Sequence, residues 1–81
     1  MKAKIYITLK DGIHDPQGHA IQQSLQTLGF ETVQDVRMGK FLEVDFHDME
    51  KDSAESQIQS MCQKLLANTV IEDFRYEILQ T

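Results

Sequence analysis

The first ten residues alternate between apolar and polar side chains. The apolar residues occupy the odd positions, Ala3, Ile5, Ile7 and Leu9. The even positions carry Lys2, Lys4, Tyr6, Thr8 and Lys10. A period of two is the pattern of a half-buried strand, so we predict a strand over residues 2–10 and a loop over residues 11–14.

A helix is predicted to begin at Pro16. The proline ring holds Asp15 out of the α region, as a capping residue requires, and Pro16 suits the first helical position. Gly29 supplies a left-handed stop at the other end. The apolar residues between them recur at helical spacing: Ala20, Ile21, Leu25 and Leu28.

Two further strands are predicted between residues 33 and 46, joined by a tight turn or bulge at Gly39. The first carries Val33, Val36 and Met38. The second alternates, with one face made of Leu42, Val44 and Phe46. Its other face is made of Phe41, Glu43 and Asp45.

A second helix and a last strand complete the pattern. Asp52 can cap the helix, with Glu55 three residues on as in a capping box, and Asn68 is read as its C-terminal cap. The last strand covers residues 70–79, with one side formed by Phe74, Tyr76 and Ile78. The helix has an apolar stripe that consists of Ala54, Ile58, Met61, Cys62, Leu65 and Leu66.

The order βαββαβ predicts an α+β fold in a single domain, residues 1–81. Two strand–helix–strand halves usually give a four-stranded antiparallel sheet with both helices on one face, the ferredoxin-like layout. A chain of 81 residues builds only a small core. We therefore expect the protein to be oligomeric.

The charge, the N-terminal pattern and the cysteine content bear on the partners and the location of the protein. The net charge of −5 repels a phosphate backbone, and the lysines and arginines are scattered, so no nucleic-acid partner is expected. The alternating N-terminal stretch is neither a signal peptide nor a membrane span. The single cysteine cannot form an internal disulfide. A cytoplasmic location without a membrane partner follows by elimination.

The residue types that could serve in catalysis or metal binding are better explained by structural or solvated roles. Cys62 lies on the buried helical stripe, where a thiol is shielded and behaves as a small hydrophobe. The three histidines lack the spacing of helical zinc ligands: His14, His19 and His47. No serine has a histidine implied by spacing. We expect no catalytic, cofactor-binding or metal site in this chain.

Two surfaces are candidates for contact with other proteins. Residues 16–30 contain no Asp, Glu, Lys or Arg, and Gln22 and Gln26 lie on the polar face of the predicted helix. Interface centres are depleted of charge, although a glutamine-rich solvated helix has the same composition. The uncovered sheet face is the candidate homodimer surface, with Glu43 and Asp45 as charge partners for its lysines. Its proposed members are Tyr6, Thr8, Phe74 and Tyr76.

Four stretches of the chain together resemble PurS, the small subunit of phosphoribosylformylglycinamidine (FGAM) synthase. The match runs essentially from end to end. The stretches are Lys2–Lys10, Asp15–Gly18, Val36–Lys40 and Met61–Phe74, the last containing Cys-x-Lys-Leu-Leu-Ala-Asn and Ile-Glu-Asp.

The resemblance implies a non-catalytic subunit of a ligase complex in purine biosynthesis. Members resemble dimers or dimers of dimers that join a large ATP-dependent synthetase subunit to a glutamine amidotransferase subunit and support the passage of ammonia between them. The complex is expected to use ATP and magnesium, and this chain is expected to bind neither of them. The family motif further implies partner contacts at Arg37, Gly39, Lys40, Asn68 and Asp73. For each of these, a turn, a helix cap or a solvated charge is the alternative reading.

Two other functions use the same layout. A regulatory module would bind a small metabolite between subunits, and its melting temperature would respond to that ligand. A binder of single-stranded RNA would need stacking aromatics in basic surroundings. Tyr6 could stack, but the acidic balance of the chain argues against RNA.

Overall fold

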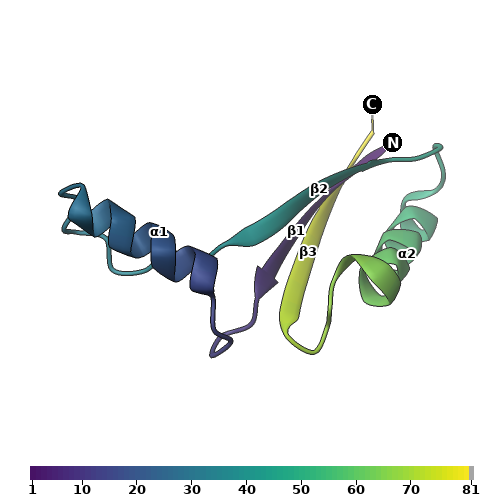
Figure 1. Cartoon of the computed structure of the whole chain (residues 1–81). Coiled ribbons are helices and arrows are strands. Elements are labelled where there is room, and N and C mark those ends of the chain that lie inside the picture. Colours follow the sequence, from purple (N-terminus) through teal and green to yellow (C-terminus); the bar gives the residue numbers. More distant parts are fainter. Residues whose placement is uncertain (81) are drawn as a thin grey trace.

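The computed structural model describes residues 1–80, which form one small sheet, two helices and a long projecting arm (Figure 1). This confirms the α+β class. In chain order the elements are β1 (Lys2–Leu9), α1 (Pro16–Thr27), β2 (Gly39–Asp45), α2 (Lys51–Met61), the π-helical turn η1 (Cys62–Leu66) and β3 (Glu72–Leu79).

The sheet has β1 in the centre, with β2 and β3 antiparallel on either side of it. Ile5 lies opposite Leu42 on one neighbour and Tyr76 on the other, so all three side chains share a face. α2 packs on this face and closes the core. The core residues are Ala3, Ile5, Ile7, Ile58, Cys62 and Ala67. β1 is therefore half-buried, as its alternation of apolar and polar residues predicts, with Ala3, Ile5 and Ile7 in the core.

The predicted four-stranded sheet is wrong, because residues 33–38 form no strand and the described residues contain three strands. The backbone groups of this segment are bound by side chains. Gln22 Nε2 donates to the Gln34 carbonyl, Gln26 Nε2 donates to the Val33 carbonyl, and Met38 N donates to Asp15. Backbone groups satisfied in this way do not need a neighbouring strand.

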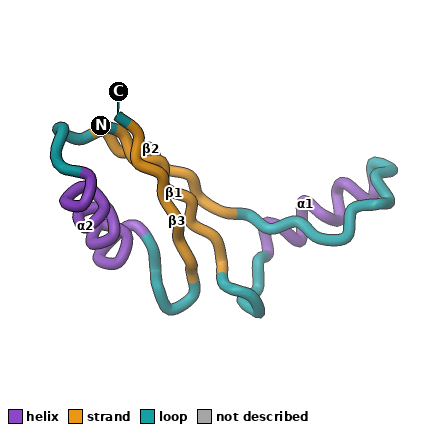
Figure 2. Tube along the Cα trace, turned by 180° about the vertical axis from the view of Figure 1, so that it is seen from behind, coloured by secondary structure: helices purple, strands orange, loops and turns teal. Residues whose placement is uncertain are grey.

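The prediction that both helices cover one face of the sheet is also wrong. α1 points away from the sheet, and residues 28–38 return antiparallel along it (Figures 1 and 2). We call residues 16–38 the arm. Only Gly18 of α1 is buried. The apolar residues of α1 therefore face the returning segment or solvent, and the core is built on α2 alone.

Gly39 is the first residue of β2 and not the turn between two strands. Its importance is steric, because a Cβ at this position would approach the Ile7 carbonyl oxygen to 2.6 Å. The missing side chain lets the beginning of β2 lie close against β1.

The ends of α2 differ from the prediction by a few residues. The helix begins at Lys51 after Glu50, which makes no side-chain cap, so Asp52 lies in the first turn and is not the cap. The predicted apolar stripe is confirmed for Ala54, Ile58 and Cys62, which are buried. Leu65 is 82% exposed, because a π-helical turn changes the angular spacing of side chains.

Candidate interaction surfaces

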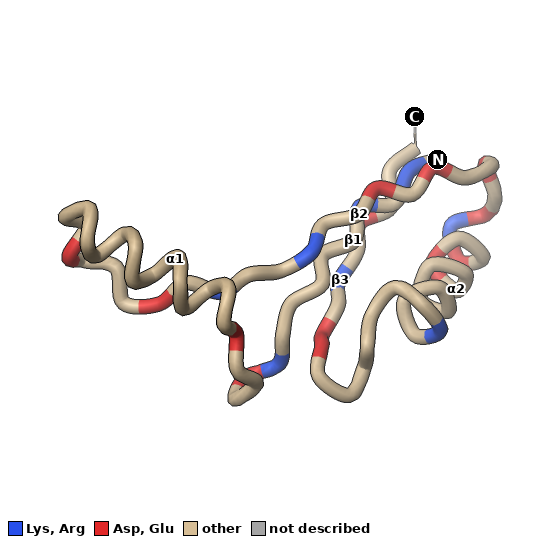
Figure 3. The backbone as a smooth tube through the Cα atoms, viewed as in Figure 1, with Lys and Arg blue, Asp and Glu red and all other residues tan. Residues whose placement is uncertain are grey.

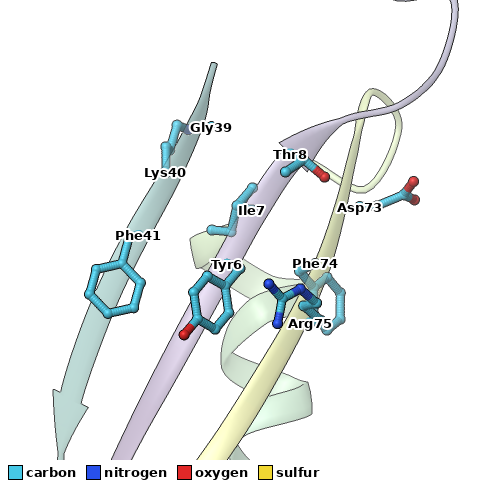
Figure 4. A pocket seen from close by; sticks show the side chains of 9 residues that line it. All are labelled: Tyr6, Ile7, Thr8, Gly39, Lys40, Phe41, Asp73, Phe74 and Arg75. Carbon is cyan, nitrogen blue, oxygen red and sulfur yellow. The ribbon is translucent and has the colours of Figure 1, made fainter. Parts of the chain in front are cut away.

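The sheet face opposite α2 is uncovered, and we call it the open sheet face. Tyr6 lies at its centre, between Phe41 of β2 and Arg75 of β3 (Figure 4). The Tyr6 and Phe41 rings are 5.1 Å apart between centroids. The Arg75 guanidinium carbon lies 3.9 Å from the centroid of the Tyr6 ring. This contact is a cation–π interaction, and it was not anticipated from the sequence.

A shallow depression of about 340 Å³ crosses the open sheet face. It lies over residues 6–8 of β1, 39–41 of β2 and 73–75 of β3, and Figure 4 labels the residues that line it. Aromatic, cationic, hydroxyl and carboxylate groups meet there, namely those of Tyr6, Thr8, Phe41, Asp73 and Arg75. Tyr, Phe and Arg are enriched at contact surfaces between proteins, so this face is a candidate contact surface.

The charges on the open sheet face are arranged in pairs. Lys2 Nζ lies 2.6 Å from a Glu43 carboxylate oxygen, which confirms Glu43 as a charge partner for the lysines. Their hydrogen bond raises the pKa of Lys2 and lowers the pKa of Glu43. Both side chains are partly exposed, so the pair contributes little to stability. Its main effect is to neutralise this part of the face.

Phe74 and Tyr76 do not belong to the open sheet face. They lie opposite Ile7 and Ile5 of β1 and pack against the core beneath α2. The reason is the register of β3, which places Asp73 and Arg75 on the open side. Tyr6 and Thr8 remain the members of the predicted dimer surface that share this face.

The residues implied by the family motif gather at one end of the sheet, and the polar ones have partners within the chain. Lys40 Nζ lies 3.4 Å from Glu72. Asp73 lies 3.9 Å from Lys10 Nζ. The Asn68 side chain accepts a hydrogen bond from Val70 N at 3.2 Å. Gly39, Lys40 and Asp73 line the depression together.

Glu72 is a site residue that the sequence did not reveal. It is 9% exposed, and its carboxylate accepts a hydrogen bond of 2.7 Å from Asn68 N. That bond lowers the pKa of Glu72, and Lys40 lowers it further. The neighbouring Asn68 in a turn is the one signal that could have indicated an anchored carboxylate.

The arm forms the second candidate surface. α1 carries no charged residue, as Figure 3 shows, and exposed apolar residues cluster toward the arm tip. Leu28 is 73% exposed and Phe30 is 57% exposed. Gln22 and Gln26, predicted as partner contacts, hydrogen-bond the returning segment. They therefore hold the arm together, while the apolar side chains remain accessible.

Arg37 lies at the base of the arm. Its guanidinium donates to the carbonyl oxygens of Ile13 and Lys10, at 3.2 and 3.3 Å. Asp15 lies across from Arg37, just before α1, and is 6% exposed. Hydrogen bonds from Gly18 N and Met38 N lower the pKa of Asp15. Asp15 as helix cap is confirmed, and its second hydrogen bond is a new observation.

The remaining candidates lie away from both surfaces. Cys62 is fully buried, and this burial raises the pKa of its thiol. In residues 1–80, no three His, Cys, Asp or Glu side chains group as they would to hold a metal ion. Over the same range no helix has the length and apolar character needed to cross a membrane.

Comparison with known proteins shows which family has this sequence and fold. The family model described as "PurS: Phosphoribosylformylglycinamidine (FGAM) synthase" matches residues 2–80. The subunit PurS of phosphoribosylformylglycinamidine synthase from Bacillus subtilis is 47% identical over 77 residues, which cover 95% of this chain and 90% of the relative.

Solved structures agree with the sequence match. The B. subtilis PurS structure superposes with a TM-score of 0.86 at 46% identity, and 98% of each chain is covered. A chain in the structure of PurLQS from Thermotoga maritima reaches a TM-score of 0.86 at 26% identity, covering 96% of this chain and 95% of that one. Because sequence and fold agree over nearly its whole length, this chain belongs to the PurS family of phosphoribosylformylglycinamidine synthase.

Proposed function

We propose that this chain is the non-catalytic subunit that joins the synthetase and glutamine amidotransferase subunits of FGAM synthase, in the cytoplasm, and so supports the transfer of ammonia between them. Membership of the PurS family makes it a subunit of that enzyme of purine biosynthesis. The PurLQS structure concerns a relative, and it supports an analogous assembly here. ATP and magnesium are used by the complex and are bound outside this chain.

One structural observation carries the joining role. The chain displays two separate surfaces, the open sheet face and the arm, and neither covers the other (Figures 1 and 2). The first offers paired charges around the Tyr6–Phe41 ring pair. The second offers an uncharged helix with exposed Leu28 and Phe30. Two chemically different surfaces on one small chain suit contact with two neighbours, a second copy at the open sheet face and a larger subunit at the arm.

Self-association forms part of the proposal. The core is small, and the open sheet face has no cover within the chain, so a second copy is the partner we assign to it. Tyr6, Thr8, Phe41 and Arg75 are its central residues. The resulting dimer, or a pair of such dimers, leaves the arms free for the larger subunits.

The test measures FGAM synthesis by the purified synthetase and amidotransferase with and without this chain, using two nitrogen sources. With glutamine, the proposal predicts that synthesis requires the chain. With ammonium salt, synthesis is predicted to proceed without it, because external ammonia bypasses the transfer. Equal glutamine-dependent rates with and without the chain would contradict the proposal.

A metabolite-binding module is the second candidate, and the depression on the open sheet face is the observation that favours it. Its volume of about 340 Å³ is at the lower end of the range for small-molecule sites. Arg75 could bind an anionic group there. A rise in the melting temperature of the isolated protein with a purine nucleotide or glutamine, abolished by Arg75→Ala, would support this alternative.

A further inference from the structure

The arm joins the sheet at a narrow junction of two chain segments, which we call the neck. The outgoing segment contains residues 10–18, and the returning segment contains residues 36–38. The Asp15 carboxylate binds both. Its Oδ1 accepts a hydrogen bond from Gly18 N at 2.9 Å on the outgoing segment. Its Oδ2 accepts one from Met38 N at 2.7 Å on the returning segment.

Arg37 binds across the neck in the opposite direction. It belongs to the returning segment, and its guanidinium donates to two carbonyl oxygens of the outgoing one, those of Lys10 and Ile13. The neck is thus held by an anion reaching one way and a cation reaching the other. Hydrogen bonds with a charged partner are stronger than neutral ones. The Arg37 bonds are solvent-exposed, so Asp15, which is buried, contributes more.

Gly18 brings the two segments into direct contact. A Cβ at this position would lie 2.2 Å from the Val36 carbonyl oxygen and 2.6 Å from Asp15 Oδ2. No side chain fits there without displacing the backbone of the returning segment. Glycine is therefore required for close approach, and its φ is not in the left-handed region.

Among residues 1–80, no other set of contacts anchors the arm to the sheet to a comparable extent. α1 buries only Gly18, and the arm points away from α2 and the sheet in both views (Figures 1 and 2). The outgoing loop contains Gly12 with a φ of +84°, a backbone conformation that glycine adopts without steric cost. This loop therefore does not by itself fix the direction of the arm. The direction of the arm therefore depends on the hydrogen bonds of the neck and not on packing.

We propose that Asp15, Arg37 and Gly18 are positioning residues that fix the angle between the arm and the sheet, so that the chain presents its two surfaces to its neighbours in one geometry. This inference rests on the proposed joining function. A rigid neck lowers the conformational entropy lost when both surfaces bind at once. A flexible neck would leave each surface intact and still weaken assembly.

The Asp15→Ser variant separates this role from helix capping. Serine is a good N-cap and can still accept from Gly18 N, but its short side chain does not reach Met38 N. Asp15→Ala removes both hydrogen bonds. Arg37→Lys keeps the charge and loses the two-donor fork. Gln57→Ala, an exposed change on α2, is the matched control.

The first readout is the neck itself. In Asp15→Ser, we expect hydrogen exchange at the Met38 amide to accelerate while the Gly18 amide and the β1 amides keep their protection. Spin labels at Thr32→Cys and Gln57→Cys, both exposed positions, report the angle, because Cys62 is buried and is not labelled. The distance distribution between the labels is expected to be narrow in the parent and broad with Asp15→Ser.

The second readout is assembly with the synthetase and amidotransferase. We expect Asp15→Ser to weaken assembly about tenfold, because a chain with a flexible neck loses more conformational entropy when both surfaces bind. Arg37→Lys should assemble better than Arg37→Ala, and Gln57→Ala should equal the parent. Unchanged assembly by Asp15→Ser despite a broad distance distribution would overturn the inference, and so would an unbroadened distribution.

The two proposals fail in different ways. If the parent chain does not assemble with the larger subunits, the joining function is wrong, while exchange and spin-label distances still decide whether the neck fixes the angle. If the parent assembles and Asp15→Ser does so equally well, only the inference about the neck is wrong.

Discussion

Glu72 shows how much one side chain organises at the end of the sheet. Its carboxylate accepts a hydrogen bond from Asn68 N, in the connection between η1 and β3, and lies 3.4 Å from Lys40 Nζ on the far edge strand. Both contacts favour its ionised form, so its pKa lies below the ordinary value of 4.5. A group with a lowered folded-state pKa stabilises the fold above its unfolded pKa and loses that contribution as the pH falls.

Glu72→Gln is therefore expected to flatten the acid dependence of stability. In the parent protein, the free energy of unfolding should decline as the pH falls below about 4.5 through the lower folded-state pKa values of Glu72 and Asp15. Denaturant melts at several pH values between 7 and 3 measure this decline. Equal slopes in the parent and in Glu72→Gln would show that Glu72 does not carry the effect.

Cys62 is expected to be chemically inert in the folded protein. Burial raises the pKa of its thiol and excludes reagents, because the thiolate is the reactive form. A thiol-specific dye should leave the native chain unmodified at neutral pH and label it fully in denaturant. Rapid labelling of the native chain at a rate independent of denaturant would mean that the core around Cys62 opens.

Individual contacts were predictable where they depend on local pattern. The Lys2–Glu43 pair and the buried Cys62 both follow from alternation and helical spacing. The second hydrogen bond of Asp15 and the stacking of Arg75 on Tyr6 did not follow. They join residues 23 and 69 positions apart, and only the tertiary fold sets such distances.

α2 and η1 cover the core, and their buried and exposed side chains should respond differently to truncation. Ile58→Ala removes a fully buried side chain and is expected to cost about 2–5 kcal/mol of unfolding free energy. Leu65→Ala changes a side chain that is 82% exposed and should stay within about 0.5 kcal/mol of the parent. Urea denaturation of the two variants measures the difference. An equal loss of unfolding free energy in the two variants would mean that Leu65 is buried against another copy of the chain.

The open sheet face should carry self-association. Phe41→Lys introduces a charge beside Tyr6 at a position that is 53% exposed, and charge is disfavoured at an interface centre. We expect it to raise the dissociation constant of the dimer about tenfold or more, as measured by sedimentation equilibrium. Leu65→Lys, on the other side of the sheet, is the control. Identical association of Phe41→Lys and the parent would move the dimer contact elsewhere.

The elements were predictable where their pattern was strong and misassigned where it was weak. β1, α2 and β3 have clear periods and form nearly as predicted. Residues 33–38 are apolar at uneven spacing, and in the fold their backbone bonds to side chains of α1 and to Asp15. A single sequence cannot reveal that a helix will bind the returning chain in place of the sheet, because helix propensity is local and packing is not.

The chain as a whole is an elongated body, with principal extents of 49 × 28 × 14 Å. Its core occupies one end, and the arm reaches out from it (Figure 2). An arm that buries almost nothing within its own chain contributes little to the stability of the monomer. Its exposed Leu28 and Phe30 are instead available to a neighbour, and the joining function that we propose rests on this exposure.

The most direct test of that function is the mass of a mixture of the synthetase and amidotransferase, measured by light scattering with and without this chain. The account predicts separate proteins in its absence and one complex containing all three in its presence. Leu28→Ser in the arm is expected to reduce that complex, while Gln57→Ala leaves it unchanged. A complex of the two large subunits that forms equally well without this chain would contradict the account.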